Sequence, residues 1–233
     1  MTSPDALPDT PPVTSIARAD THRLIPSKYS QDSVLARLAG GDDALLADLF
    51  DLDGATNERL LADGGRLPGI GPHELIFGVP HASIVNAAFT HAHPSGSRFN
   101  GPDRGAWYAA YDRATSVAEV AFHRAVDYAE IGVWDDHVTY DDYLSDVAAD
   151  LHDVRTGAWA DCLDPASYVA AQGLAERLLE SGALGVVYPS VRDAGGTCVA
   201  LFRPALVTHV RKGATLRFTW NGSPVPAVEV VGG

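Results

Sequence analysis

The spacing of apolar positions changes along the chain: the helical patterns all lie before residue 182, and the pattern afterwards is strand-like. Apolar side chains recur at helical spacing over 31–66, over about 116–130 and over about 165–181. The last segment follows Asp164, a candidate N-cap, and ends at Gly182, a typical stop signal. We therefore predict helices at these three places, with glycine pairs interrupting the first of them.

Short apolar and aromatic runs predict the strands. The first run, 106–111, reads Ala-Trp-Tyr-Ala-Ala-Tyr and is typical of a buried strand. The acidic stretch 137–155 fits a solvent-facing strand or a loop, and we favour a strand. Strands without regularly alternating helices predict an α+β fold instead of a doubly wound sheet. Further strands are predicted at 185–188, 197–202, 206–211, 215–220 and 225–231.

Composition adds expectations about location and partners. Residues 1–20 carry four prolines among polar residues, which predicts a flexible N-terminal tail, and they lack the pattern of a signal peptide. No apolar run approaches the ~18 residues of a membrane span. The net charge of −13 argues against direct binding of nucleic acid, which requires a basic face. The two distant cysteines fit a reducing compartment, so we expect a cytoplasmic protein with neither membrane nor nucleic acid as partner.

A first candidate site lies in the loop before the strand at 106–111. Arg98 and Arg104 flank a Gly/Pro turn there. Loops at strand ends often carry binding groups, and the forked donors of arginine suit a diphosphate. The alternative is a surface turn whose arginines form salt bridges. This segment alone favours that alternative.

A second candidate lies at the start of the helix predicted from 116. Ser116 and Glu119 have the S-x-x-E spacing of a capping box, in which Glu119 would only cap the helix. Alternatively, a glutamate near the positive end of a helix stays ionised and can accept hydrogen bonds from ribose hydroxyls. The spacing leaves both interpretations open.

A third candidate follows the strand at 185–188. Pro189 ends the strand, and Ser190 and Arg192 come directly after it. Ser190 lacks the G-x-S-x-G context of a hydrolase nucleophile, so it either donates a hydrogen bond to a ligand or caps a turn. His91 and His93 could share one strand face, but no third ligand is evident, and we predict no metal site.

These segments together resemble the RES domain family, named after its signature Arg, Glu and Ser. Here the matching residues are Arg98, Glu119 and Ser190. The resemblance runs from about Arg23 to the end of the chain and is thin over 30–90. It predicts a single RES domain over 21–233 with a helix-rich region at 30–90. Other matching segments are Trp-Tyr-Ala-Ala at 107–110, Ala-Glu-Val at 118–120 and Tyr-Pro-Ser-Val-Arg at 188–192.

The resemblance implies a fold and an activity. The fold would be similar to ADP-ribosyltransferases, with a split, mostly antiparallel β core around an NAD cleft and helices flanking it. The activity would be cleavage of NAD⁺ as substrate, without a bound cofactor. Inorganic phosphate as co-substrate would give nicotinamide and ADP-ribose 1″-phosphate. Water as acceptor, transfer of ADP-ribose to a protein, and a non-catalytic binding module are the alternatives.

The resemblance also implies a biological partner. RES proteins resembling this chain are toxins of toxin–antitoxin pairs, and their antitoxin has an Xre-type helix-turn-helix and blocks the cleft. We therefore expect such an antitoxin as a protein partner, while a homo-oligomer is left open.

Roles carry over from the family residue by residue. Glu119 would hold the ribose hydroxyls and stabilise positive charge as the glycosidic bond breaks. Arg98 and Arg23 would bind the phosphates of NAD⁺ or fix the cleft. Ser190 would form a hydrogen bond to the nicotinamide or ribose side of NAD⁺. The implied catalytic residues are Arg98, Glu119 and Ser190. The implied substrate-binding residues are Arg23, Tyr108 at the nicotinamide ribose, Tyr188, and Arg192, which we expect to help receive phosphate.

Overall fold

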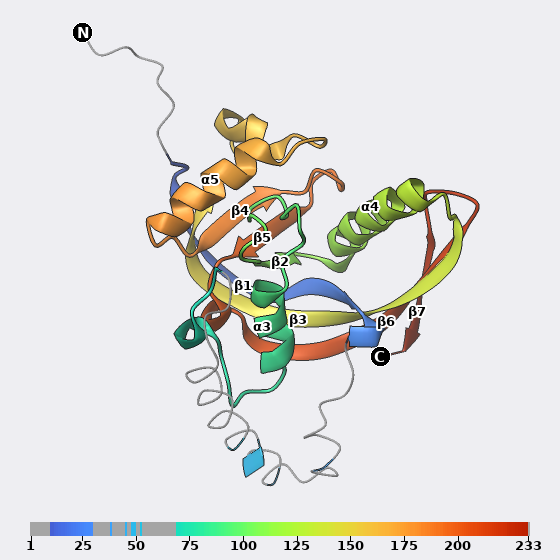
Figure 1. Cartoon of the computed structure of the whole chain (residues 1–233), viewed down its shortest axis with the longest axis horizontal. Helices are drawn as coiled ribbons and strands as arrows, with labels where there is room; N and C mark the ends of the chain where they lie inside the picture. The colour runs from blue at the N-terminus through green and yellow to red at the C-terminus, as the bar shows by residue number, and fades with distance from the viewer. Residues whose placement is uncertain are drawn as a thin grey trace.

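A mostly antiparallel sheet flanked by helices forms the molecule (Figure 1). The computed structural model describes residues 10–29 and 69–232, together with positions 38, 45, 48, 49 and 52. The predicted α+β fold class is confirmed within this part of the chain. The predicted helices over 31–66, and with them most of the helix-rich region expected at 30–90, lie outside the described residues.

The described residues include seven strands of one sheet. The strands expected at 106–111, 137–155, 185–188, 197–202 and 225–231 are confirmed to within a few residues. The two strands expected at 206–211 and 215–220 are instead one strand, because its pairing with β3 continues across two bulges. In chain order the strands are β1 (Val13–Pro26), β2 (Trp107–Ala110), β3 (Asp135–Asp153), β4 (Gly185–Pro189), β5 (Thr197–Leu201), β6 (Thr208–Asn221) and β7 (Ala227–Gly232).

Three α-helices and several 3₁₀ turns complete the described elements. The helix predicted at 165–181 begins later, at Val169, because the Asp164 side chain accepts a hydrogen bond from the Ala166 backbone at 2.7 Å and closes a local turn. The helices are α3 (Ala82–Thr90), α4 (Arg113–Ile131) and α5 (Val169–Glu180), and the turns are η1 (Ser27–Tyr29), η2 (Pro72–Glu74), η3 (Gly157–Leu163) and η4 (Pro204–Leu206).

The strand β1 corrects the expected tail. The tail was predicted over 1–20, but positions 13–20 belong to β1, so the prediction is wrong for them. β1 pairs with β3 from Val13 opposite His152 to Pro26 opposite Tyr140. Backbone pairing with a long neighbour therefore forms this strand, although no continuous apolar run marks it in the sequence. Residues 1–9 lie outside the described part of the chain.

The sheet is split into two subsheets that meet only at their edges. One contains β2, β5 and β4, and the other contains β1, β3, β6 and β7. β1 meets β2 at a single pair, His22 opposite Ala110, and β3 meets β4 over His152 and Asp153. An apolar core that includes Trp107 fills the space between the subsheets. This is the split, mostly antiparallel core that the resemblance implied.

The helices α4 and α5 cover the outer faces of the two subsheets. α5 packs on β2, β5 and β4, where Leu174 and Leu178 are almost completely buried. α4 packs on β1, β3 and β6 through Tyr128, whose ring lies 5.0 Å from Trp220 in an edge-to-face contact. Figure 1 shows α4 and α5 over different parts of the sheet, with the connection from β4 to β5 reaching into the region between them.

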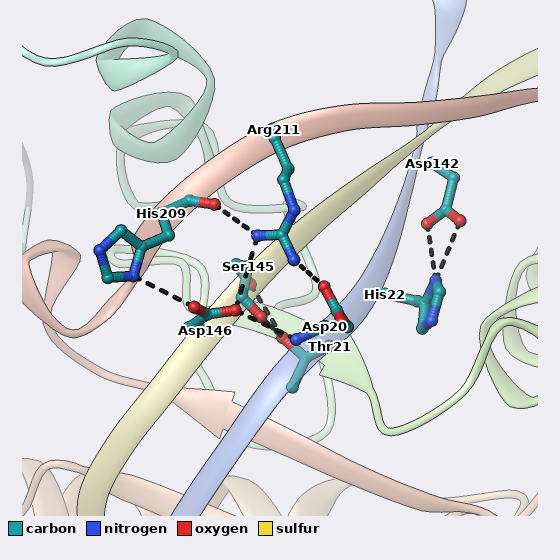
Figure 2. A network of polar contacts seen from close by, with 8 residues as sticks. All are labelled: Asp20, Thr21, His22, Asp142, Ser145, Asp146, His209 and Arg211. Atoms are coloured by element: carbon teal, nitrogen blue, oxygen red, sulfur yellow. Dashed lines mark hydrogen bonds and ion pairs between the residues drawn. The ribbon is translucent and has the colours of Figure 1, made fainter. Parts of the chain in front are cut away.

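Polar contacts join β1, β3 and β6 where the strands bend (Figure 2). The carboxylate of Asp146 accepts a hydrogen bond from the backbone of Asp20 at 3.1 Å and lies 3.1 Å from Nδ1 of His209. Asp20 and His209 both adopt left-handed backbone conformations, with φ of 57° and 49°. Arg211 forms ion pairs with Asp20 and Asp146. Asp146 therefore stabilises two unfavourable backbone conformations at once.

A buried carboxylate fixes the beginning of α4 against the sheet. Asp142 of β3 is fully buried, and one of its oxygens lies 2.9 Å from Nδ1 of His22 on β1 (Figure 2). The same oxygen accepts a hydrogen bond of 2.9 Å from Nε of Arg113, the first residue of α4. The helix that carries Glu119 is thus held at its start by β1 and β3.

Candidate functional site

The N-terminus of α4 is capped by a residue that the sequence did not single out. Asp112 has an extended backbone, and its carboxylate accepts a hydrogen bond from the Thr115 backbone at 2.8 Å. The capping box proposed for Ser116 and Glu119 is therefore wrong, because the helix begins three residues before Ser116. Glu119 lies in the second turn, and its carboxylate is available for another contact.

That contact comes from the connection between β4 and β5. The hydroxyl of Ser190 donates to Oε1 of Glu119 at 2.6 Å. The hydroxyl oxygen of Ser190 in turn accepts hydrogen bonds from the backbone of Arg192 at 3.1 Å and of Asp193 at 3.0 Å. A hydroxyl has one proton and two lone pairs, so all its capacity is used. Oε2 of Glu119, by contrast, has no hydrogen-bond partner among the described residues.

Arg192 links this connection to two other elements. Its Nη2 donates to the carbonyl oxygen of Pro165 at 2.7 Å, in the segment between η3 and α5. Its guanidinium carbon lies 3.3 Å from the ring centre of Phe122 on α4. Its buried Nε has no partner within the described part of the chain. Arg192 therefore lies between α4 and the η3–α5 segment, next to Ser190.

Arg98 holds the same η3–α5 segment from another side. It is buried in the turn before β2, and its Nη1 donates to the carbonyl oxygens of Cys162 at 3.1 Å and Asp164 at 2.9 Å. The guanidinium also lies 4.7 Å from the ring centre of Tyr168. Arg98 and Arg192 thus bring two positive charges to one short segment, using only part of their donor capacity.

Tyr108 fixes the turn that carries Arg98. Its hydroxyl donates to Oδ1 of Asn100 at 2.7 Å and accepts from the Phe99 backbone at 2.9 Å. Burial raises the pKa of Tyr108, so the phenol stays protonated at neutral pH. Its proton is committed to Asn100, which leaves the ring and one lone pair for a ligand. The sequence did not indicate Asn100 as part of the site.

Arg23 and Tyr188 lie near Tyr108 in the two subsheets. Arg23 on β1 donates to the carbonyl oxygen of Tyr108 at 3.0 Å and lies 4.7 Å from the ring centre of Trp107. Burial lowers the pKa of Arg23 to about 10, so it is still charged at neutral pH. Burial also raises the pKa of Tyr188, whose ring lies 4.8 Å from that of Phe99. Arg23 on β1 therefore connects the two subsheets through β2.

Arg104 does not join this group. Its guanidinium binds the carboxylate of Glu74 through two hydrogen bonds of 2.9 and 2.8 Å and also donates to the carbonyl oxygen of Phe202 at 2.6 Å. The side-chain hydrogen bond from Arg104 lowers the pKa of Glu74 to about 2. Arg104 therefore forms a salt bridge, which is the alternative that the sequence left open for both arginines of this loop.

Comparison with known proteins assigns the chain to a family. The sequence profile described as the RES domain matches residues 75–221, a range that includes Arg98, Tyr108, Glu119 and Ser190. The chain belongs to the RES domain family. Arg23 precedes the matched range. A comparison with curated proteins finds no match.

Among solved structures, this RES domain is similar to the crystal structure of the MbcT–MbcA toxin–antitoxin complex of M. tuberculosis. The sequence identity is 14%, and the alignment covers 88% of this chain and 87% of that chain with a TM-score of 0.48.

His123 lies close enough to Glu119, Arg192 and Arg98 for their charges to act on it, and the sequence did not select it. It lies on α4 one turn after Glu119, and its ring reaches solvent. Surrounding protein nevertheless lowers the pKa of His123 by desolvation, and although Glu119 opposes this, Arg192 and Arg98 add to the lowering. This lowering of the pKa favours the neutral imidazole of His123. The signal in the sequence was its spacing of four residues from Glu119.

Neither a nearby cavity nor a metal centre belongs to the RES site. An open cavity of about 570 Å³ is lined by two carboxylates and no basic side chain, which does not suit an anionic dinucleotide. Over 10–29 and 69–232, no group of three or more His, Cys, Asp or Glu residues could hold a metal ion. None of the described helices is long and apolar enough to span a membrane. The cavity is lined by Ala160, Asp161, Asp164, Ser167, Val169 and Ala170.

Proposed function

We propose that this RES domain protein cleaves the bond between nicotinamide and ribose in NAD⁺. The observation that carries the proposal is the pair of Glu119 and Ser190. One oxygen of the carboxylate is held at 2.6 Å by a hydroxyl whose own hydrogen bonds are complete, and the other oxygen is open among the described residues. A carboxylate prepared in this way can stabilise a cation without reorganising during the reaction.

The chemistry of NAD⁺ matches a site of this kind. Its pyridinium is already a cationic leaving group, so the reaction does not require a general acid. As the C1″–N bond breaks, its electron pair leaves with nicotinamide and the ribose develops oxocarbenium character, as in glycoside hydrolysis. In our proposal Oε2 of Glu119 accepts hydrogen bonds from the ribose hydroxyls and faces this charge. Ser190 keeps the carboxylate oriented.

The arginines would act on the phosphates only at short range. A net charge of −13 repels an anionic dinucleotide, and salt screens charges beyond roughly 8 Å at physiological ionic strength. Arg98 and Arg192 reach the same segment and retain unused N–H donors, which supports a role in binding the diphosphate or the acceptor. The bonded hydroxyl of Tyr108 leaves its ring to contact the nicotinamide ribose.

We propose inorganic phosphate as the acceptor, with Arg192 as its binding residue. A phosphate oxygen then forms a bond to C1″ as nicotinamide leaves, and the products are nicotinamide and ADP-ribose 1″-phosphate. Neutral His123 adds no charge but can donate one hydrogen bond beside Arg192. Water would give ADP-ribose instead, and a protein acceptor would become labelled.

We also propose that the chain is the toxin of a toxin–antitoxin pair and that an Xre-type antitoxin covers the cleft. The resemblance of its signature residues to those of RES toxins supports this role. Expression of the chain should then stop growth and lower cellular NAD⁺, and co-expression of the antitoxin should restore both. Growth that is unaffected by the expressed, folded chain would contradict the toxin role.

Incubation with NAD⁺, in the presence and absence of phosphate, tests the activity directly. We expect release of nicotinamide, with ADP-ribose 1″-phosphate forming only when phosphate is present. Free ADP-ribose in both samples would indicate water as the acceptor, and label transferred from NAD⁺ to protein would indicate a transferase. Intact NAD⁺ after incubation with folded protein, free of any inhibitory partner, would rule out the proposed function.

A further inference from the structure

Two side chains of α4, one helical turn apart, contact the connection between β4 and β5. Thr115 and Glu119 are four positions apart and so project from the same side of the helix. Glu119 accepts a hydrogen bond from the hydroxyl of Ser190, and the hydroxyl of Thr115 donates one to Oδ2 of Asp193 at 2.6 Å. These two contacts, added to the packing of α4 on the sheet, fix the turn against the side of the helix that carries Glu119.

Asp193 also orients Ser190 through its backbone. Its N–H donates to the hydroxyl oxygen of Ser190 at 3.0 Å, so it helps to direct the Ser190 proton toward Glu119. Two backbone hydrogen bonds close the turn, from Ser190 to Gly196 at 2.9 Å and from Gly196 to Asp193 at 3.0 Å. One residue therefore contributes to both contacts between this turn and α4.

Gly196 lets the turn approach Thr115 closely. A Cβ atom at Gly196 would lie 2.4 Å from Oγ1 of Thr115 and 2.9 Å from Oδ2 of Asp193. Both distances are too short for real contacts, so any larger residue would displace the partners of this hydrogen bond. The close approach shows that the backbone of the turn packs directly against the start of α4.

The Thr115 proton has two possible acceptors, and the distances favour Asp193. Both carboxylate oxygens of Asp112 lie 3.0 Å from the Thr115 hydroxyl, compared with 2.6 Å for Asp193. Asp112 already accepts the Thr115 backbone N–H as the N-cap. Thr115 is completely buried, so water does not compete for its hydroxyl. The bond to Asp193 is therefore a defined link between the turn and the helix.

We infer that Asp193 is a positioning residue for Glu119: through Thr115 it sets α4, and through Ser190 it directs the hydrogen bond that orients the carboxylate. Asp193 itself need not touch the substrate. The consequence for catalysis rests on the proposed cleavage of NAD⁺, whereas the consequence for the Glu119 environment does not.

Two pairs of variants test the inference. Asp193→Ala and Thr115→Val each remove the hydrogen bond between the Thr115 hydroxyl and Asp193. Asp193→Asn keeps an oxygen as the acceptor of this bond, and Thr115→Ser keeps a hydroxyl as its donor. We expect the first pair to lower kcat for NAD⁺ cleavage about tenfold, the scale of one lost hydrogen bond, with KM changed less than about twofold. The conservative pair should retain most of the activity. Asp150→Ala, which removes an exposed carboxylate–hydroxyl contact with Ser15 between β1 and β3, is the matched control.

A spectroscopic measurement separates this inference from the proposed function. The carboxyl ¹³C resonance of Glu119, assigned with Glu119→Gln, should shift in Asp193→Ala and Thr115→Val and stay in place in the conservative variants. An unmoved resonance, or an unchanged kcat alongside an active wild type, would overturn the inference. If the wild type leaves NAD⁺ intact, the proposed function fails, and the Glu119 resonance alone tests whether Asp193 positions Glu119. If Asp193→Ala does not fold, Thr115→Val provides the same test.

Discussion

Replacing Ser190 by alanine removes a hydroxyl that makes three hydrogen bonds. The bond to Glu119, at 2.6 Å, involves an ionised acceptor, and such bonds contribute about 1.5–3 kcal/mol. The backbone N–H groups of Arg192 and Asp193 also lose their acceptor, at a cost of up to about 1–3 kcal/mol each where water cannot replace it. Because the site is near solvent, we expect Ser190→Ala to lower the free energy of unfolding by about 2–4 kcal/mol.

The same change should slow catalysis. If the bond to Ser190 orients Glu119 for the transition state, losing about 1.5–3 kcal/mol corresponds to a kcat about 10- to 150-fold lower. Ser190→Thr, which keeps a hydroxyl, should lie between the wild type and Ser190→Ala. Denaturant unfolding measures the stability change, and release of nicotinamide under steady-state conditions measures kcat.

The two measurements together can refute the reasoning. A Ser190→Ala protein that is less stable but keeps kcat within about twofold of the wild type would show that the hydroxyl only caps a turn. A large fall in kcat without loss of stability would instead indicate direct contact between Ser190 and the substrate.

Three further predictions concern the surroundings of the site. The pKa of Glu74 falls from 4.5 to about 2 on folding, so its contribution to stability is complete above pH ~4.5 and is lost toward pH ~2. After discounting for partial exposure, we expect this contribution to the free energy of unfolding to be about 1–2 kcal/mol. The difference between the unfolding free energies at pH 3 and pH 6 should therefore be smaller by this amount in Glu74→Gln than in the wild type. Asn100→Ala should raise KM, because the Tyr108 hydroxyl loses its acceptor; an unchanged KM would argue against this. Asp142→Ala should lower the melting temperature, since removing one partner of a buried ion pair costs about 3 kcal/mol, and an unchanged transition in calorimetry would contradict it.

The sequence predicted the strands around the site better than the long pairings that enclose it. Apolar runs mark β2, β4 and β5, because both faces of these strands are buried. β1 has no continuous apolar run of this kind and is formed by pairing with β3, a partner more than a hundred residues away. Local spacing contains no signal for such a contact, so the first part of β1 was expected to be a tail.

The site itself shows a second limit of local patterns. The S-x-x-E spacing at Ser116 allowed Glu119 to be a cap or a functional carboxylate, and the position of Asp112 excludes the cap. Similarly, Ser190 caps a turn, as one of its two alternatives expected, but its proton goes to Glu119, a partner that neither alternative named. Asp193 has no distinguishing pattern, because its role depends on Thr115, which is distant in the sequence.

Comparison of the wild type with Glu119→Gln on NAD⁺ tests the central claim most directly. The variant keeps an oxygen to accept the Ser190 hydroxyl but lacks the negative charge that would stabilise the developing cation. With folding verified for both proteins, we predict rapid release of nicotinamide by the wild type and a rate at least about 100-fold lower for the variant. Equal rates, or no release by the wild type, would contradict the account.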